Sequence, residues 1–154
     1  MLLKNRPKVL FAPIDARAEK SAKPPEYMSE GAAGADIFAY LDEPATLKPF
    51  ERKLIPTGFK IAIEDGFEGQ VRPRSGLAFK KGLTVANAPG TIDSDYRGEL
   101  KILVVNIGNE PVQIEPGERI AQLVISPVAQ AVIEKVKELP KTKRGEGGFG
   151  STGQ

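Results

Sequence analysis

The side chains best suited to acid–base chemistry lie together in residues 87–99, a turn-rich stretch between two apolar runs. Asp93, Asp95 and Glu99 surround Tyr96 there. The chain contains no histidine and no cysteine, which excludes the commonest general base, a thiol nucleophile and thiolate zinc sites. A carboxylate in this stretch is therefore the natural general base, and the ring face of Tyr96 suits a planar ligand. The alternative is a solvated hairpin tip, for which a turn former such as Asp95 is equally suited.

Residues 72–76, Arg-Pro-Arg-Ser-Gly, have the composition of a phosphate-binding turn. We expect Ser75 to be the N-cap of one short helix over residues 75–82. Free N–H groups at a helix N-terminus attract phosphate. Gly76 would let a ligand approach the backbone closely, and Arg74 could add bidentate contacts. The alternative is an ordinary helix cap beside a surface arginine.

The last residues of the chain, 144–153, are rich in glycine and also carry Arg144 and Phe149. A glycine-rich backbone can surround phosphates, and an exposed aromatic side chain such as Phe149 needs something to cover. Ten extended residues reach roughly 33 Å at most, which is enough to reach a neighbouring subunit. The alternative is a flexible tail, the common fate of a glycine-rich terminus.

Two single polar residues occupy unusual places. Asp36 follows the small residues 31–35 at the start of an expected strand. Gln122 lies within the apolar run 120–125, so it needs a hydrogen-bond partner or must face outward.

The chain has 16 glycines and 13 prolines spread between short apolar runs. Many short strands separated by turns indicate an all-β sandwich, barrel or jelly roll. The run 102–105 is continuously apolar, so a strand here needs cover on both faces. Another subunit or a loop of the same chain could supply the second cover, and the segment alone does not decide between them.

Composition excludes several classes of function. The 22 basic and 20 acidic side chains give a net charge of +2, which provides no electrostatic footprint for nucleic acid. The short aliphatic runs predict no membrane span, and Lys4 directly after Leu3 argues against a secretory signal. We therefore expect a cytoplasmic protein. With neither His nor Cys, any metal should be a hard ion bound by oxygen, such as Mg²⁺.

Taken together, five segments resemble the five motifs of the trimeric dUTPase (dUTP diphosphatase) family, and they occur in that family's order. They span about four-fifths of the chain: residues 33–37, 73–78, 87–100, 117–123 and 144–153.

The resemblance implies a jelly-roll-like, all-β homotrimer. Residues 1–143 would form one β domain, and residues 144–154 a glycine-rich arm that closes an active site of a neighbouring subunit. It also implies Mg²⁺-assisted hydrolysis of dUTP to dUMP and pyrophosphate. That reaction limits uracil incorporation into DNA and supplies dUMP for thymidylate synthesis.

The family's site residues carry over onto matching positions. Asp93 would be the catalytic base that activates water for attack on the α-phosphorus. Asp36 and Gln122 would contact the metal through water, with Mg²⁺ held mainly by the phosphates. Tyr96 would pack on deoxyribose and exclude a 2′-hydroxyl. The implied substrate-binding residues are Arg74, Ser75, Gly76, Asn87, Thr91, Ile92, Asp93, Tyr96, Lys101, Gln122, Arg144, Phe149, Gly150, Ser151 and Thr152.

Two other functions fit the same fold. A dCTP deaminase or a bifunctional relative would need a catalytic glutamate, for which Glu99 is the nearby acid; the Asp93–Tyr96 pairing and the fifth motif argue against it. A non-catalytic, nucleotide-sensing module would have no need of Asp93.

Overall fold

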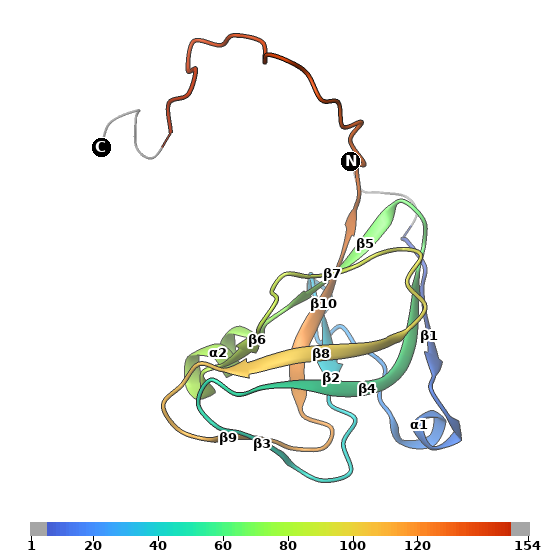
Figure 1. Ribbon diagram of the computed structural model, residues 1–154. Helices are drawn as coiled ribbons and strands as arrows, with labels where there is room; N and C mark the ends of the chain where they lie inside the picture. Colours follow the sequence, from blue (N-terminus) through green and yellow to red (C-terminus); the bar gives the residue numbers. More distant parts are fainter. Residues whose placement is uncertain (1–5, 149–154) are drawn as a thin grey trace.

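The chain folds into antiparallel β-sheets with two short helices, as a computed structural model describing residues 6–148 shows (Figure 1). The helices are α1 (Ala16–Ser21) and α2 (Ser75–Lys81). The strands are β1 (Val9–Pro13), β2 (Ala35–Phe38), β3 (Ala45–Leu47), β4 (Arg52–Ile63), β5 (Phe67–Arg72), β6 (Leu83–Val85), β7 (Gly90–Ile92), β8 (Glu99–Asn106), β9 (Val112–Ile114) and β10 (Arg119–Pro127). The sheets have the orders β1-β4-β8-β6, β2-β10-β5-β7 and β3-β9. The all-β prediction is confirmed.

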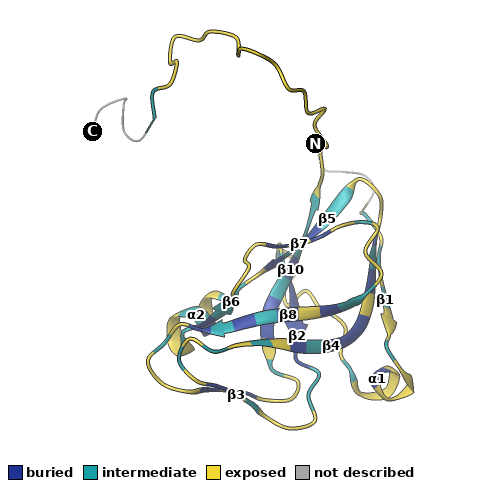
Figure 2. Cartoon of the chain, viewed as in Figure 1, coloured by how far each residue is buried: buried dark blue, intermediate teal, exposed yellow. Residues whose placement is uncertain are grey.

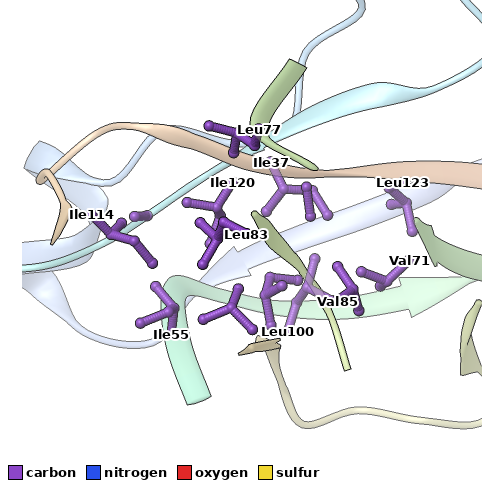
Figure 3. Packing of buried hydrophobic residues seen from close by; sticks show 14 of the residues in the cluster. Ile37, Ile55, Val71, Leu77, Leu83, Val85, Leu100, Ile114, Ile120 and Leu123 are labelled. Atoms are coloured by element: carbon purple, nitrogen blue, oxygen red, sulfur yellow. The ribbon is translucent and has the colours of Figure 1, made fainter. Parts of the chain in front are cut away.

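One hydrophobic core joins the two larger sheets. Ile55 and Ile102 come from the first sheet, Val71 and Leu123 from the second, and all four are buried in the same cluster (Figure 3). Burying side chains of this size stabilises the fold by about 1.5–3 kcal/mol each. Buried residues concentrate on the long central strands (Figure 2). The core therefore holds rigid the strands that carry the predicted site residues.

The apolar run 102–105 lies in strand β8, and its side chains alternate between the two faces of the sheet. Ile102 and Val104 are fully buried, whereas Leu103 and Val105 point to the opposite face and are only half-buried. Leu54, the partner of Leu103 on β4, is 61% exposed. Both faces of the run 102–105 are thus apolar, although Glu99 and Lys101 also lie on the outer face of β8. The described part of the chain leaves that outer face partly open.

The helices differ from the prediction in two respects. A single helix was expected, but α1 also forms, because the Asp15 carboxylate accepts the N–H of Ala18 at 2.7 Å and caps the first turn. Six residues are too short to show a helical period in the sequence. In α2, the predicted N-cap is wrong by one position: Ser75 is the first helical residue and Arg74 precedes it in extended conformation. Gly82 ends α2 in the left-handed region, with φ of 64°.

The chain leaves the body of the domain after β10. Residues 128–148 contain no helix or strand, and in Figure 1 they extend away from both large sheets. Val132 and Ile133 on this segment are 87% and 94% exposed. The predicted arm beginning at residue 144 is the distal part of this longer segment. Among the described residues, neither helix is long and apolar enough to cross a membrane.

Candidate active site

A cavity of about 450 Å³, which we call the β7–β8 pocket, brings together the predicted residues of the 87–101 segment. Its walls are Leu54, Val71, Asn87, Gly90, Thr91, Ile92, Asp93, Tyr96, Glu99, Leu100, Lys101 and Leu103. Two larger hollows, of about 680 Å³ beside α2 and about 810 Å³ beside β1, contain none of the predicted site residues. The mixture of apolar walls with a few convergent polar groups is typical of a small-molecule site.

The pocket forms where the chain crosses between the two large sheets. Strands β6 and β8 pair antiparallel at the base of the segment, but β7 in between pairs with β5 of the other sheet, Gly90 lying opposite Val71. The turn-rich stretch 87–99 therefore does not form a simple hairpin between β6 and β8. It is opened in the middle by β7, which creates the cavity. Gly90 is needed for the close approach, because a Cβ there would lie 3.1 Å from Asn87 Nδ2.

Tyr96 stands at the mouth of the pocket in a fixed orientation. Its phenol donates a hydrogen bond to the carbonyl oxygen of Glu99 at 2.8 Å. Its backbone N–H donates to the carbonyl oxygen of Asp93 at 3.2 Å, which closes a tight turn. The ring is 44% exposed, so one face remains available to a ligand.

Asp93 lies on the same turn, directly after β7. Its side chain is exposed and makes no hydrogen bond or ion pair with the described residues. A carboxylate at the rim of a pocket, free of partners among the described residues, is accessible to water, as a general base must be.

A second polar group, which we call the Asp36 cluster, consists of Asp36, Arg74, Arg119 and Gln122. The Asp36 side chain is only 12% exposed; its Oδ2 accepts a hydrogen bond from Arg119 Nη1 at 3.1 Å and lies 3.5 Å from Arg74 Nε. Arg74 Nη1 donates to the carbonyl oxygen of Arg119 at 3.0 Å. Two guanidinium groups thus surround one carboxylate, which leaves an excess positive charge suited to an anion.

Gln122 connects this cluster to the turn before α2. It lies opposite Asp36 in the β2–β10 ladder, and its Nε2 donates to the carbonyl oxygen of Pro73 at 3.1 Å. The sequence prediction that Gln122 needs a partner is confirmed. Gly34 fits closely against this amide, because a Cβ there would lie 2.5 Å from Gln122 Oε1. Ser75 is exposed next to the turn.

The family model described as dUTPase matches residues 20–153. Deoxyuridine 5′-triphosphate nucleotidohydrolases of Rhizobium etli and Desulfotalea psychrophila are 60% and 55% identical to this chain. The alignments cover 84% of this chain and 84% of the first relative, and 95% of this chain and 97% of the second.

The chain belongs to the dUTPase family. It is accordingly a hydrolase of deoxyuridine triphosphate. Among solved structures, the dUTPase of Staphylococcus bacteriophage 80alpha, a G164S mutant with dUpNHpp, superimposes with a TM-score of 0.81 at 30% identity, covering 96% of this chain and 99% of that one. A D95N mutant dUTPase of phage phi11, described with a structural Mg(II) ion, has a TM-score of 0.75 at 26% identity and covers 87% of this chain and 99% of that one.

In one copy of this dUTPase, the predicted residues fall into separate groups. The residues of the 87–101 segment share the β7–β8 pocket, whereas the Asp36 cluster lines no part of it. Arg144 lies on the extended segment, where, within residues 6–148, its Nε donates to the carbonyl oxygen of Gly147 alone, at 2.8 Å. Phe149, Gly150, Ser151 and Thr152 lie outside the described residues.

The Asp36 cluster also contains Arg119, which is not among the predicted site residues. It stands at the start of β10, where a charged residue is usually solvated, and its register against β2 is interrupted by a bulge before Ala121. The one available signal in the sequence is that Arg119 and Gln122 are the polar residues of the segment 119–125, which is otherwise apolar. Its contact with Asp36 could not be read from that spacing.

Proposed function

We propose that this dUTPase cleaves dUTP to dUMP and pyrophosphate, with Asp93 activating the water that attacks the α-phosphorus. The observation that carries this proposal is the exposed Asp93 carboxylate at the rim of a cavity of nucleoside size, beside Tyr96. A carboxylate is a weak base, so orientation of the water must supply much of the rate. In a cell, the reaction would limit uracil incorporation into DNA and supply dUMP for thymidylate synthesis.

The β7–β8 pocket would select the base and the sugar. Asn87 and the backbone near Lys101 would pair with the uracil edge, and Thr91 and Ile92 would line the wall beside it. The narrow space beside Gly90 would exclude a 5-methyl group. Buried polar groups that match uracil would be left unpaired by cytosine, which is a strong basis for rejection.

Tyr96 would pack its exposed face on the deoxyribose ring. Since the phenol is held by the Glu99 carbonyl oxygen, the ring cannot move aside without losing a hydrogen bond. A 2′-hydroxyl would then meet the ring, and UTP would be rejected.

The phosphate chain would lie against the Asp36 cluster of a subunit. Arg74 and Gln122 would contact phosphate oxygens, together with Ser75 and the open backbone at Gly76, where a Cβ would meet no atom within 4 Å. The buried Asp36 carboxylate holds two guanidinium groups in place, so it would organise the anion site as well as contact water around the metal.

The oxygen donors of this cluster fit a Mg²⁺ ion that the substrate brings with it. Among residues 6–148, no group of three or more Asp, Glu, His or Cys side chains gathers to hold an ion directly. Mg²⁺ keeps several waters and commonly uses one or two carboxylates plus substrate phosphates. Asp36 and Gln122 would bind the water around it, and the ion would neutralise charge on the phosphate oxygens when bound.

A homotrimer would unite groups that lie apart in one copy. None of the four residues of the Asp36 cluster lines the β7–β8 pocket, and Leu54, Leu103 and Val105 form an apolar, partly open patch on the outer face of β4 and β8. We place subunit contact on that face. Residues 1–143 would form the β domain, while the arm 144–154 would bring Arg144 to the γ-phosphate and Phe149 to the uracil ring of a neighbouring site, with Gly150, Ser151 and Thr152 donating to the terminal phosphates. The enzyme would act in the cytoplasm.

Pyrophosphate release measured with dUTP, dTTP, dCTP and UTP, with and without Mg²⁺, tests the proposal. We expect rapid release from dUTP in the presence of Mg²⁺ and little from the other three nucleotides. Ammonia released from dCTP without dUTP turnover would instead establish a deaminase. Tight binding of dUTP with no product would establish a nucleotide-sensing module.

A further inference from the structure

Strand β4 carries an irregularity directly behind the β7–β8 pocket. Pro56 pairs with Lys101 and Lys60 pairs with Glu99, so residues 57–59 of β4 lie opposite Leu100 alone. Gly58 has a φ of 79°, a backbone conformation that favours glycine. A bulge of this kind leaves backbone groups without partners in the ladder, and these groups must be satisfied in another way.

Glu99 and Thr57 provide hydrogen-bond partners for the backbone groups at this bulge. The N–H of Gly58 donates to Glu99 Oε1 at 3.2 Å, and the Thr57 hydroxyl donates to the carbonyl oxygen of Leu100 at 2.6 Å. The other carboxylate oxygen of Glu99 lies 3.5 Å from Lys101 Nζ, and the Glu99 side chain is only 15% exposed. Both oxygens of Glu99 are therefore engaged within the protein, by groups on two different strands.

The same residue also fixes the orientation of Tyr96. The carbonyl oxygen of Glu99 accepts the hydrogen bond from the Tyr96 phenol at 2.8 Å. Gly98, between them, has no room for a side chain, because a Cβ there would overlap the Tyr96 hydroxyl and ring. The wall of the pocket from Tyr96 to Lys101 is thus fastened to β4 through Glu99.

We propose that Glu99 is a positioning residue of the nucleoside pocket. Its carboxylate ties β8 to the β4 bulge, and its backbone carbonyl then holds the Tyr96 ring where it can meet the sugar. The inference rests on the proposed function for the identity of the sugar, but the tie itself is independent of it. The positioning role also explains why Glu99, the acid that a dCTP deaminase would need, is present here without a catalytic role.

Glu99→Gln and Glu99→Leu separate this role from others. The glutamine keeps an oxygen acceptor for the Gly58 N–H, whereas leucine removes it. We expect Glu99→Gln to keep KM for dUTP within about twofold, and Glu99→Leu to raise KM about tenfold, the equivalent of one lost hydrogen bond to a half-buried group. The preference for dUTP over UTP should fall in Glu99→Leu, while kcat changes less than KM.

Glu64→Leu is the matched control. Glu64 also accepts one backbone N–H, from Lys8 at 2.8 Å, but it lies outside the pocket, so this variant should leave KM and the dUTP preference unchanged. The ring signals of Tyr96 in a protein with ¹³C-labelled tyrosine provide a readout without substrate. They should shift in Glu99→Leu and stay in place in Glu99→Gln and Glu64→Leu.

Two outcomes would overturn the positioning role. One is a large loss of kcat in Glu99→Gln at unchanged KM, which would make Glu99 a catalytic group. The other is a Tyr96 signal and a dUTP preference in Glu99→Leu that match those of Glu64→Leu. If the wild-type protein released no pyrophosphate from dUTP, the proposed function would fail, but the Tyr96 signals would still test the tie.

Discussion

Gly34→Ala is a small change that should act on catalysis through a single side chain. An added Cβ would lie 2.5 Å from Gln122 Oε1 and 3.2 Å from its Cβ and Cδ. Heavy atoms cannot approach to 2.5 Å without a hydrogen bond, so the Gln122 amide must turn away from Gly34. Turning it breaks the hydrogen bond to the Pro73 carbonyl oxygen, now 3.1 Å long.

The magnitude follows from that one hydrogen bond. Its loss should lower the free energy of unfolding by about 1 kcal/mol, because Gln122 is half-buried and its amide can reach water after it turns. If Gln122 also contacts a phosphate in the transition state, kcat/KM for dUTP should fall about tenfold, the equivalent of about 1.4 kcal/mol. The effect on activity should thus be comparable with the effect on stability, although Gly34 itself carries no functional group.

Urea unfolding and steady-state pyrophosphate release measure the two quantities. Gly31→Ala is the control, because Gly31 lies in the same loop and a Cβ there meets no atom within 4 Å. This control should match the wild-type protein in both assays.

A double-mutant cycle tests the route of the effect. In a Gln122→Ala background, Gly34→Ala should lower kcat/KM by less than about twofold, a change within the roughly 0.3–0.5 kcal/mol to which such cycles resolve additivity. If Gly34→Ala lowers activity equally in both backgrounds, Gln122 does not transmit the effect and the reasoning is refuted. The same holds if Gly31→Ala is as damaging as Gly34→Ala.

Three further predictions concern the base, the arm and the core. Asp93→Asn should keep dUTP affinity, measured by calorimetry, but lower kcat by about 10²–10⁴-fold; equal turnover would remove Asp93 from its role. Deleting residues 145–154 should leave the thermal midpoint unchanged, since residues 145–148 are exposed or half-exposed and, among the described residues, their hydrogen bonds reach only Thr142 and Arg144, yet it should nearly abolish turnover. Asn106→Leu should lower the free energy of unfolding by about 3 kcal/mol, because the fully buried Asn106 amide donates to the carbonyl oxygens of Leu47 and Glu110 and its oxygen accepts the N–H of Gly108. A urea midpoint equal to that of the wild-type protein would contradict this value.

The local features of the sequence predicted most of the fold that bears on function. Turn residues and short apolar runs predict the β class, and the Gly82 stop signal predicts the end of α2. Those signals act within a few residues, so they can be read along the chain. The sequence did not predict helix α1, because the stability of this helix comes from one cap at Asp15 and from burial of Ala18. Burial is not a local property of the sequence.

The residue types by themselves determined the kind of chemistry. A chain without histidine or cysteine leaves carboxylates and a hard cation, and the resemblance of the five motifs to the dUTPase family predicts this chemistry at Asp93 and its neighbours. The first statement depends on composition and the second on the motifs, and the sequence contains both in full.

Which side chains come into contact depends on the tertiary structure alone. Asp36 and Arg119 are 83 residues apart in the chain, and Gly58 and Glu99 are 41 residues apart. Each pair meets because strands from distant parts of the chain lie side by side and bury the carboxylate between them. A buried carboxylate needs a partner, but the register of the sheets, including the bulge in β4, determines which partner it finds.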